Sequence, residues 1–249
     1  MKVVLFGVPV DPLTLEECVE RVAAMVGDGG AHQVVTLNPE LLYRARSEPR
    51  LRAILDRADL VTADGVGIVW AARRTGQWLP ERVTGIDLMM ALVRRAAACG
   101  WRVFLLGAAP GVAAEVARRL KSLYPGLGIA GWQHGFWTPE EEPEVVAAIK
   151  RARPQLLFVA LGAPRQEEWI ARHLPALGSV VAMGVGGSFD VVAGRVRRAP
   201  ALLRRLNLEW LGRLVLQPRR WRRMLVLPRF AWLVFRTYGW RGAGTRCRR

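Results

Sequence analysis

The sequence predicts a doubly wound α/β fold, in which a mainly parallel sheet carries helices on both faces, followed by a basic, amphipathic helical appendage. Two observations predict the sheet. Strand-like and helix-like segments alternate along the chain, and Leu156–Leu161 and Val180–Val185 are apolar almost throughout, as in buried parallel strands. A third observation predicts the appendage: near Gly194 the alternation stops, and arginine is interleaved with tryptophan and leucine.

The expected elements follow from apolar patterns and helix-start signals. A capping box, Thr14-Leu-Glu-Glu17, opens a helix that runs to about Val26, and Pro39 starts the next helix. Helical periodicity predicts further helices over Gly85–Ala98, Val112–Leu120 and Glu144–Ile149, and through Trp169. Besides the two apolar strands already named, we expect strands at Val3–Phe6, Gln33–Leu37, Leu60–Thr62, Arg102–Leu106 and Ile129–Trp132.

The appendage carries nearly all of the net charge. From Arg195 onward the chain has 16 arginines, no lysine and one acid, Glu209, which gives +15 of the total +16. Ala201–Leu216 and Arg219–Tyr238 have helical, amphipathic patterns. We therefore expect an α/β domain over residues 1–195 and an arginine-rich helical appendage over 196–249, which contacts something anionic.

Composition limits the remaining possibilities. A hydrophobic fraction of 51% with 23% charged residues is enough to bury a full core. Cys18, Cys99 and Cys247 are far apart and form no metal-binding or disulfide pattern, which indicates a reducing compartment. No apolar stretch reaches the length of about 20 residues that spans a bilayer, and the amino terminus does not have the pattern of a signal peptide. We expect no metal site.

Polar residues follow several of the apolar strands, where open α/β sheets bind their ligands. Thr36 and Asn38 follow such a strand and open a helix whose amino terminus favours anions. Taken alone, Asn38 is explained more simply as a helix cap. Asp64, in the segment TADG, is either a desolvated general base or a turn residue that hydrogen-bonds its own backbone.

Further candidates lie in the later loops. Arg82 suits a phosphate, and Thr84 suits the cap of the next helix. Gln166 and Asp190 lie beside glycines that let a ligand approach the backbone, and their side chains can hydrogen-bond a base or a ribose. Gly107 begins the strand-to-helix turn GAAPG, which lacks the GxGxxG pattern of dinucleotide-binding loops. We take Arg82 as a catalytic candidate and the others as substrate-binding candidates.

Segments throughout the chain, in family order, resemble the WecG/TagA/CpsF family of glycosyltransferases. They are TLNPELLYRA, LVTADGVGIVWAAR, ERVTGIDLM, FLLGAAPGVAAEVARRL, LLFVALGAPRQEEWI, GVGGSFDVVAGRVRRAP and LNLEWLGRLVLQPRRWRRM. They cover nearly the whole sequence, and their joint occurrence is far more specific than any one of them.

The resemblance implies an inverting transfer from a UDP-sugar, without a metal ion or other cofactor. In the best-known members the donor is UDP-N-acetylmannosamine or its uronic acid form. The acceptor is N-acetylglucosamine on undecaprenyl diphosphate, in cell-envelope polysaccharide or wall teichoic acid synthesis. The match gives Asp64 the role of the base and places Asp190 beside the nucleotide. It assigns pocket positions to Thr36, Asn38, Arg82 and Gln166.

The family's carboxyl-terminal appendage docks on the membrane and brings arginines over the active site. The matching arginines here are Arg213, Arg220 and Arg223. We accordingly expect a cytoplasmic protein that binds peripherally to the anionic inner face of the cell membrane and has no nucleic-acid partner. Apolar surface on the appendage is compatible with a homo-oligomer.

Two alternatives come from other functional classes. A nucleic-acid-binding protein would explain the basic, tryptophan-containing tail but leaves the polar strand ends without a role. The apolar side chains between residues 225 and 235 also exceed what a phosphate-tracking helix needs. A nucleotide-sugar-binding protein without turnover would use the same pocket but would not depend on Asp64 for catalysis.

Overall fold

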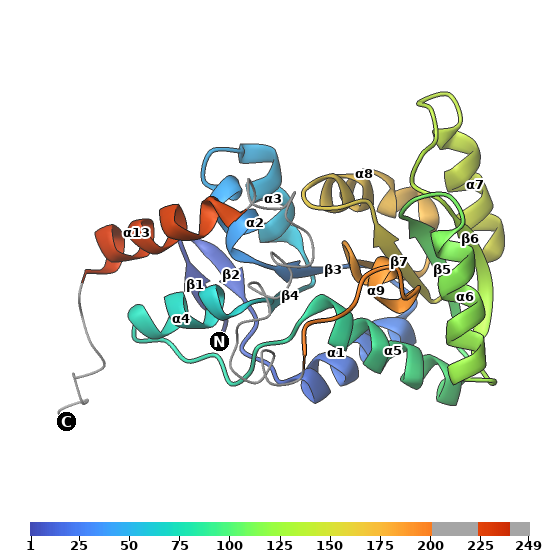
Figure 1. The fold of residues 1–249 in the computed structure, drawn as a ribbon, viewed down its shortest axis with the longest axis horizontal. Helices are drawn as coiled ribbons and strands as arrows, with labels where there is room; N and C mark the ends of the chain where they lie inside the picture. Colours follow the sequence, from blue (N-terminus) through green and yellow to red (C-terminus); the bar gives the residue numbers. More distant parts are fainter. Residues whose placement is uncertain (201–223, 240–249) are drawn as a thin grey trace.

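A six-stranded parallel sheet forms the centre of the protein, with strand order β4-β3-β8-β7-β5-β6. A computed structural model describes residues 1–200 and 224–239 (Figure 1). The sheet confirms the predicted doubly wound α/β class. Its strands are β3 (Ala31–Leu37), β4 (Leu60–Ala63), β5 (Arg102–Gly107), β6 (Gly128–Gln133), β7 (Leu156–Ala160) and β8 (Val180–Gly184).

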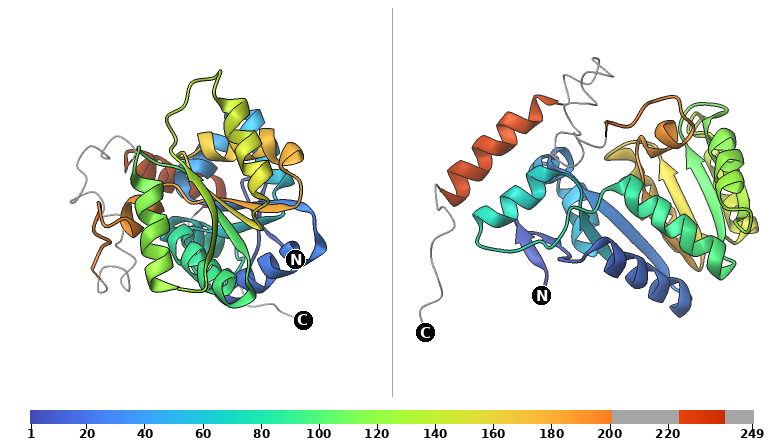
Figure 2. Two further views of the ribbon diagram at one scale, coloured as in Figure 1. Left: turned by 90° about the vertical axis from the view of Figure 1, so that its right-hand side faces the viewer. Right: turned by 60° about the horizontal axis from the view of Figure 1, so that its bottom comes forward.

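Helices cover both faces of this sheet (Figures 1 and 2). Successive strand residues point to opposite faces, so that in β5 Leu105 packs with α1, α5 and α6, whereas Phe104 packs with α7 and α8. The helices are α1 (Leu15–Asp28), α2 (Pro39–Ala45), α3 (Pro49–Arg57), α4 (Val66–Arg74), α5 (Gly85–Cys99), α6 (Val112–Leu123), α7 (Glu142–Ala152), α8 (Arg165–Leu177), α9 (Ser188–Val192) and α13 (Val226–Tyr238).

The predicted helix starts are confirmed in atomic detail. In the capping box of α1, the Thr14 hydroxyl accepts the Glu17 N–H at 3.2 Å, and the Glu17 carboxylate accepts the Thr14 N–H at 2.7 Å. Pro39 occupies the first turn of α2, where its missing N–H costs nothing. These local signals fix where α1 and α2 begin.

The first predicted strand does not join the parallel sheet. It is β1 (Val3–Leu5), which pairs antiparallel with β2 (Val8–Val10) in a separate hairpin. The two turn residues, Phe6 and Gly7, both have positive φ, as a tight hairpin turn requires. Arg52 on α3 holds this turn by donating hydrogen bonds to the carbonyls of both residues, at 3.1 and 2.8 Å.

Helix α13, from the predicted appendage, packs directly on the α/β part of the chain. It lies beside α2 and α4 and next to the hairpin (Figures 1 and 2). Phe230 is 2% exposed and meets the Phe6 ring edge-on, and the Tyr238 hydroxyl accepts the Phe6 N–H at 3.0 Å. Within residues 1–200 and 224–239, no helix has the length and apolar character needed to cross a bilayer.

Docking of α13 is expected to depend on Phe230. Replacing Phe230 with Ala removes a buried ring, which should destabilise the packing of α13 by about 3 kcal/mol or more. Hydrogen exchange of the amides in α13 should then be about 100-fold faster, because this helix opens more often. The control is Trp232→Ala on the same helix, since Trp232 is 62% exposed. Equal protection of α13 in the Phe230→Ala and wild-type proteins would show that the helix is held in another way.

Candidate active site

A cavity of about 440 Å³ opens at the carboxyl ends of β3, β4, β7 and β8. Strands β3 and β8 are neighbours, but the chain leaves β3 toward β4 and reaches β8 from β7 on the other side. This is the switch point at which doubly wound sheets leave a crevice for ligands. Of the predicted site residues, the cavity is lined by Thr36, Asn38, Asp64, Arg82, Thr84 and Gln166.

The end of β3 supplies Thr36 and Asn38. The Thr36 side chain is buried, and its hydroxyl donates to the Gly184 carbonyl of β8 at 3.4 Å, across the switch point. Asn38 caps α2 by accepting the Leu41 N–H with its side-chain oxygen at 2.9 Å. The capping explanation of Asn38 is therefore confirmed, and the same residue also lines the cavity.

The end of β4 supplies Asp64, which lies at the amino terminus of α5. One carboxylate oxygen accepts the N–H of Gly85, the first residue of that helix, at 3.2 Å. The positive end of the helix dipole attracts a negative charge there. A Cβ atom at Gly85 would lie 3.3 Å from the Thr36 hydroxyl and 3.7 Å from the Asp64 carboxylate. Glycine at this position thus lets the two polar groups approach the helix start closely.

Arg82 and Thr84 lie in the segment before α5. Thr84 caps this helix by accepting the Asp87 N–H at 3.3 Å, as predicted. Arg198 holds Asp87 through two hydrogen bonds of 2.7 Å, a bidentate pair. Burial raises the pKa of Asp87, but the hydrogen bonds from Arg198 and Thr84 outweigh burial and bring the pKa below its usual value. The carboxylate is therefore ionised at neutral pH and secures the start of α5.

The ends of β7 and β8 supply Gln166 and a glycine-rich turn. Gln166 lies in the first turn of α8 and is 4% exposed. Its side-chain oxygen accepts the Gly186 N–H at 2.9 Å, which connects α8 to the loop between β8 and α9. Gly186 has a positive φ, which suits glycine. The cavity floor is thus built from hydrogen-bonding groups of four strand ends.

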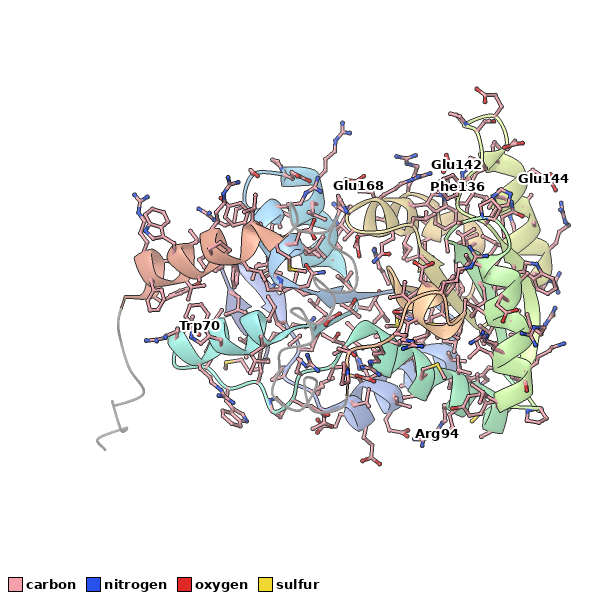
Figure 3. All side chains as sticks on the ribbon, in the orientation of Figure 1. Trp70, Arg94, Phe136, Glu142, Glu144 and Glu168 are labelled. Atoms are coloured by element: carbon pink, nitrogen blue, oxygen red, sulfur yellow. The ribbon has the colours of Figure 1, made fainter. Side chains whose placement is uncertain are left out.

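The opposite wall is apolar and comes from α4 and α13. Leu227 and Phe230 of α13 line the cavity, together with Trp70 of α4. Trp70 projects toward α13 (Figure 3), and its ring meets Phe235 edge-on with centroids 5.3 Å apart. The sequence predicted an apolar helix face here but assigned it to the membrane surface. Only the fold shows that part of this face covers the polar floor.

The sequence matches the glycosyl transferase WecG/TagA/CpsF family over residues 3–243. Relatives with high identity occur in several bacteria. An N-acetylglucosaminyldiphosphoundecaprenol N-acetyl-beta-D-mannosaminyltransferase of Bacillus spizizenii is 41% identical over 203 residues, which are 82% of this chain and 78% of the relative. Proteins of the same name from Bacillus subtilis and Staphylococcus aureus are 38% and 36% identical, the latter over 94% of this chain and 92% of the relative.

The chain belongs to the WecG/TagA/CpsF family of glycosyltransferases. The resemblance stated from the sequence is therefore confirmed, and the protein is an enzyme that transfers a sugar. The individual roles assigned to its site residues stay predictions.

The other predicted site residues of this glycosyltransferase do not line the cavity or fall outside the described residues. Gly107 and Asp190 are absent from the lining of the 440 Å³ cavity within the described part of the chain. Gly107 ends β5 with a φ of 116°, and a Cβ there would lie 2.5 Å from the Ala160 carbonyl oxygen. Asp190 lies in the short helix α9, two residues after Ser188, which lines the cavity. Arg213, Arg220 and Arg223 fall outside the described residues.

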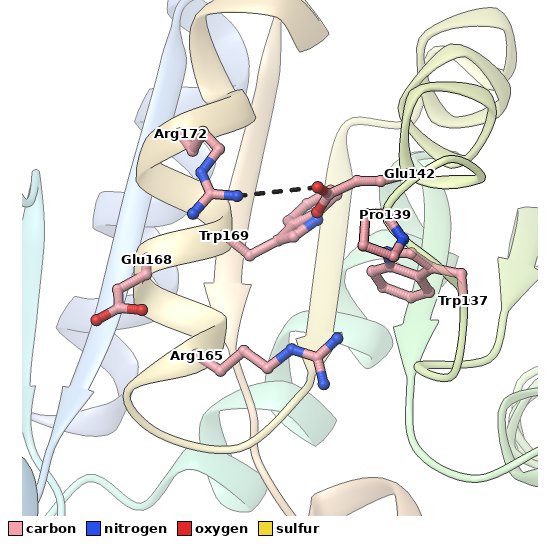
Figure 4. A pocket seen from close by; sticks show the side chains of 7 residues that line it. All are labelled: Trp137, Pro139, Glu142, Arg165, Glu168, Trp169 and Arg172. Carbon is pink, nitrogen blue, oxygen red and sulfur yellow. Dashed lines mark ion pairs between the residues drawn. The ribbon is translucent and has the colours of Figure 1, made fainter.

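A second cavity, of about 280 Å³, lies on another face of α8 (Figure 4). Three of its charged side chains contact neighbouring residues. Arg172 pairs with Glu142 at 3.8 Å, and Arg165 lies over the Trp137 ring at 5.9 Å. Because these contacts join α8 to α7 and to the loop before it, the cavity is explained by packing between the two helices.

Gly107 is expected to serve the fold and not the substrate. Changing Gly107 to Ala should lower the free energy of unfolding by about 2–4 kcal/mol, because Cβ meets the backbone of β7 and φ is positive. Chemical denaturation measures this loss. Gly76→Ala is the matched control, since φ is also positive there but the space is open, and it should cost about 1 kcal/mol. Normal stability combined with a raised KM for the sugar donor would return Gly107 to the binding site.

Proposed function

We infer that this glycosyltransferase moves N-acetylmannosamine from UDP-N-acetylmannosamine to N-acetylglucosamine on undecaprenyl diphosphate. The relatives in Bacillus and Staphylococcus carry the name of this transfer, at 36–41% identity. The observation on which the proposal rests is the position of Asp64. Its carboxylate lines a cavity of about 440 Å³ and accepts a hydrogen bond from the first N–H of α5.

The proposed reaction is a single displacement with inversion. Asp64 takes the proton from the acceptor hydroxyl, and that oxygen bonds to the anomeric carbon of the donor sugar as the carbon–oxygen bond to UDP breaks. UDP leaves from the opposite face with the bonding electrons. A positioned carboxylate base typically contributes 10²- to 10⁴-fold to such a rate.

The leaving diphosphate gains negative charge, which arginine can stabilise without a metal ion. Arg82 lines the cavity with Asp64, and a guanidinium binds phosphate oxygens through two parallel hydrogen bonds. We assign the same role to Arg213, Arg220 and Arg223. Loss of one such contact is expected to raise the barrier by about 2–4 kcal/mol.

The apolar wall of the cavity supports a lipid-linked acceptor. Met224, Leu227 and Phe230 line the same space as the polar strand ends. A nucleotide diphosphate gains little from apolar side chains, whereas an isoprenoid chain gains about 25 cal/mol for each Å² that it buries. A substrate with a sugar diphosphate head and a prenyl tail matches both halves of the cavity.

The outer face of α13 supports a peripheral position on the membrane. Trp232 is 62% exposed, Leu225 at the N-cap of the helix is 46% exposed, and the Arg236 guanidinium lies over the Trp232 ring at 5.3 Å. Tryptophan settles at the lipid interface, and each basic residue near an anionic surface contributes about 1 kcal/mol. This arrangement fits the inner face of the cell membrane, where the enzyme would serve cell-envelope polysaccharide or wall teichoic acid synthesis.

The proposed donor and acceptor can be tested by measuring UDP release. We expect release with UDP-N-acetylmannosamine and a synthetic prenyl-diphosphate-linked N-acetylglucosamine, at least about 10-fold faster than with UDP-N-acetylglucosamine, UDP-glucose or the uronic acid donor. The acceptor without its prenyl chain should require a much higher concentration, because it cannot use the apolar wall.

Controls for this assay omit the acceptor or replace it with free N-acetylglucosamine. If acceptor-dependent release occurred only with a different UDP-sugar, the proposed identity of the donor would be wrong. No acceptor-dependent release from any UDP-sugar, in a protein that still binds UDP, would favour the non-catalytic alternative.

A further inference from the structure

Glu167 is a buried carboxyl group next to the active-site cavity. It follows Gln166 in the first turn of α8 and is 1% exposed. One carboxyl oxygen accepts a hydrogen bond from the Gln166 side-chain amide at 2.8 Å. The other carboxyl oxygen has no hydrogen-bond partner among the described residues. The side chain does not line the cavity, so it does not contact a substrate bound there.

A carboxyl group in this place is costly for the fold. Burial raises the pKa of Glu167 to about 7, although the hydrogen bond from Gln166 acts in the opposite direction. An apolar side chain of similar volume avoids the penalty of burying a polar group that lacks partners. Packing alone therefore does not explain a glutamate at this position.

The end of β8 leaves room for this pair of side chains. A Cβ atom at Gly184 would lie 2.5 Å from the Gln166 amide nitrogen and 3.0 Å from a Glu167 carboxyl oxygen. The φ of Gly184 is not positive, so its backbone does not require glycine. The missing side chain is explained by the space that the Gln166–Glu167 pair occupies.

The two partners of Gln166 determine which way its amide faces. The Gly186 N–H can only donate, so the side-chain oxygen of Gln166 must face it, at 2.9 Å. The Glu167 carboxyl oxygen accepts from the side-chain nitrogen on the other side. If the amide were turned over, the Gly186 N–H would face another donor and the ionised Glu167 carboxylate would face another acceptor. The contact with Glu167 uses one N–H of the Gln166 amide, which leaves the other N–H, and Gln166 lines the cavity.

We propose that Glu167 is a positioning residue, which fixes the Gln166 amide so that its remaining N–H is offered to an oxygen of the nucleotide-sugar donor. This inference rests on the proposed function, because it takes the donor to be the ligand beside Gln166. Glu167 acts through Gln166 and contacts no reacting atom. The Gln166 amide keeps the same orientation whether or not the nucleotide sugar is bound. The amide therefore does not have to reorganise when the nucleotide sugar binds.

The test compares Glu167→Met with wild type in the full-length protein. Methionine removes the acceptor but keeps the length of the side chain. KM for the UDP-sugar should rise about tenfold, the value of one hydrogen bond, with kcat changed by less than about threefold. The thermal midpoint should change little, because the gain from removing a buried carboxyl group offsets the cost of leaving the Gln166 N–H without its acceptor. Glu167→Gln, which keeps an oxygen acceptor, should recover most of the lost affinity.

Two further variants separate positioning from a general effect on the helix. Glu168→Met changes the neighbouring residue, which faces the second cavity, and should leave donor affinity unchanged. In a double-mutant cycle, Glu167→Met should have little further effect once Gln166 is changed to Met, because both remove the same contact. A lower thermal midpoint with equal loss of donor and acceptor affinity would show a purely structural role and overturn the inference.

Calorimetric titration with UDP and the UDP-sugar keeps the two proposals distinguishable. Binding by wild type, with unchanged affinity in Glu167→Met, would overturn this inference alone. No binding of either ligand by wild type would overturn the proposed function and this inference with it. Weaker UDP-sugar binding in Glu167→Met, restored in Glu167→Gln, is the expected result.

Discussion

The site depends on the contact between the Asp64 carboxylate and the first N–H of α5. A parallel sheet gathers its carboxyl ends at one edge, and the switch between β3 and β8 opens a crevice there. The hydrogen bond from Gly85 holds the carboxylate at the mouth of this crevice at 3.2 Å. Thr84 caps α5 and Arg198 secures Asp87, so the helix start itself is held in place. The proposed base is thus positioned by backbone geometry and not by its own flexible side chain.

The cavity combines two environments, which suit the two parts of the proposed lipid-linked acceptor. Its polar floor comes from strand ends of the α/β part of the chain, and its apolar wall comes from α4 and α13. Helix α13 belongs to the basic part of the chain, which carries +15 of the net charge of +16. The proposed attraction to an anionic surface and the apolar lining of the cavity would therefore involve the same segment. Under the proposed function, this arrangement would bring the cavity to the surface that holds a lipid-linked acceptor.

Local signals made much of this structure predictable. Several features that depend on residues close in sequence were predicted correctly. They are the capping box at Thr14, the caps at Asn38 and Thr84, and the apolar parallel strands. The pairing of β1 with β2 was missed, since the tight turn at Phe6 lacks the usual Asn-Gly or Asp-Gly pair. Helix α3 was missed although Pro49 in its first turn and Leu51 and Leu55 at helical spacing are local signals. Helix α4, which has no side-chain cap, and the apolar wall depend on distant packing. The proposed positioning role of Glu167 could not be predicted from the sequence, because it depends on the burial of Glu167 and its contact with Gln166 in the fold.

The most direct test of the account is the single-turnover rate of Asp64→Asn at saturating donor and acceptor, measured together with its affinity for UDP. Asparagine can still accept the Gly85 N–H but cannot take a proton at neutral pH. We predict a rate about 10²- to 10⁴-fold lower, with UDP affinity within about threefold of wild type. A near-normal rate in Asp64→Asn would contradict the account, above all if Glu40→Gln, the other carboxylate lining the described cavity, abolished turnover instead.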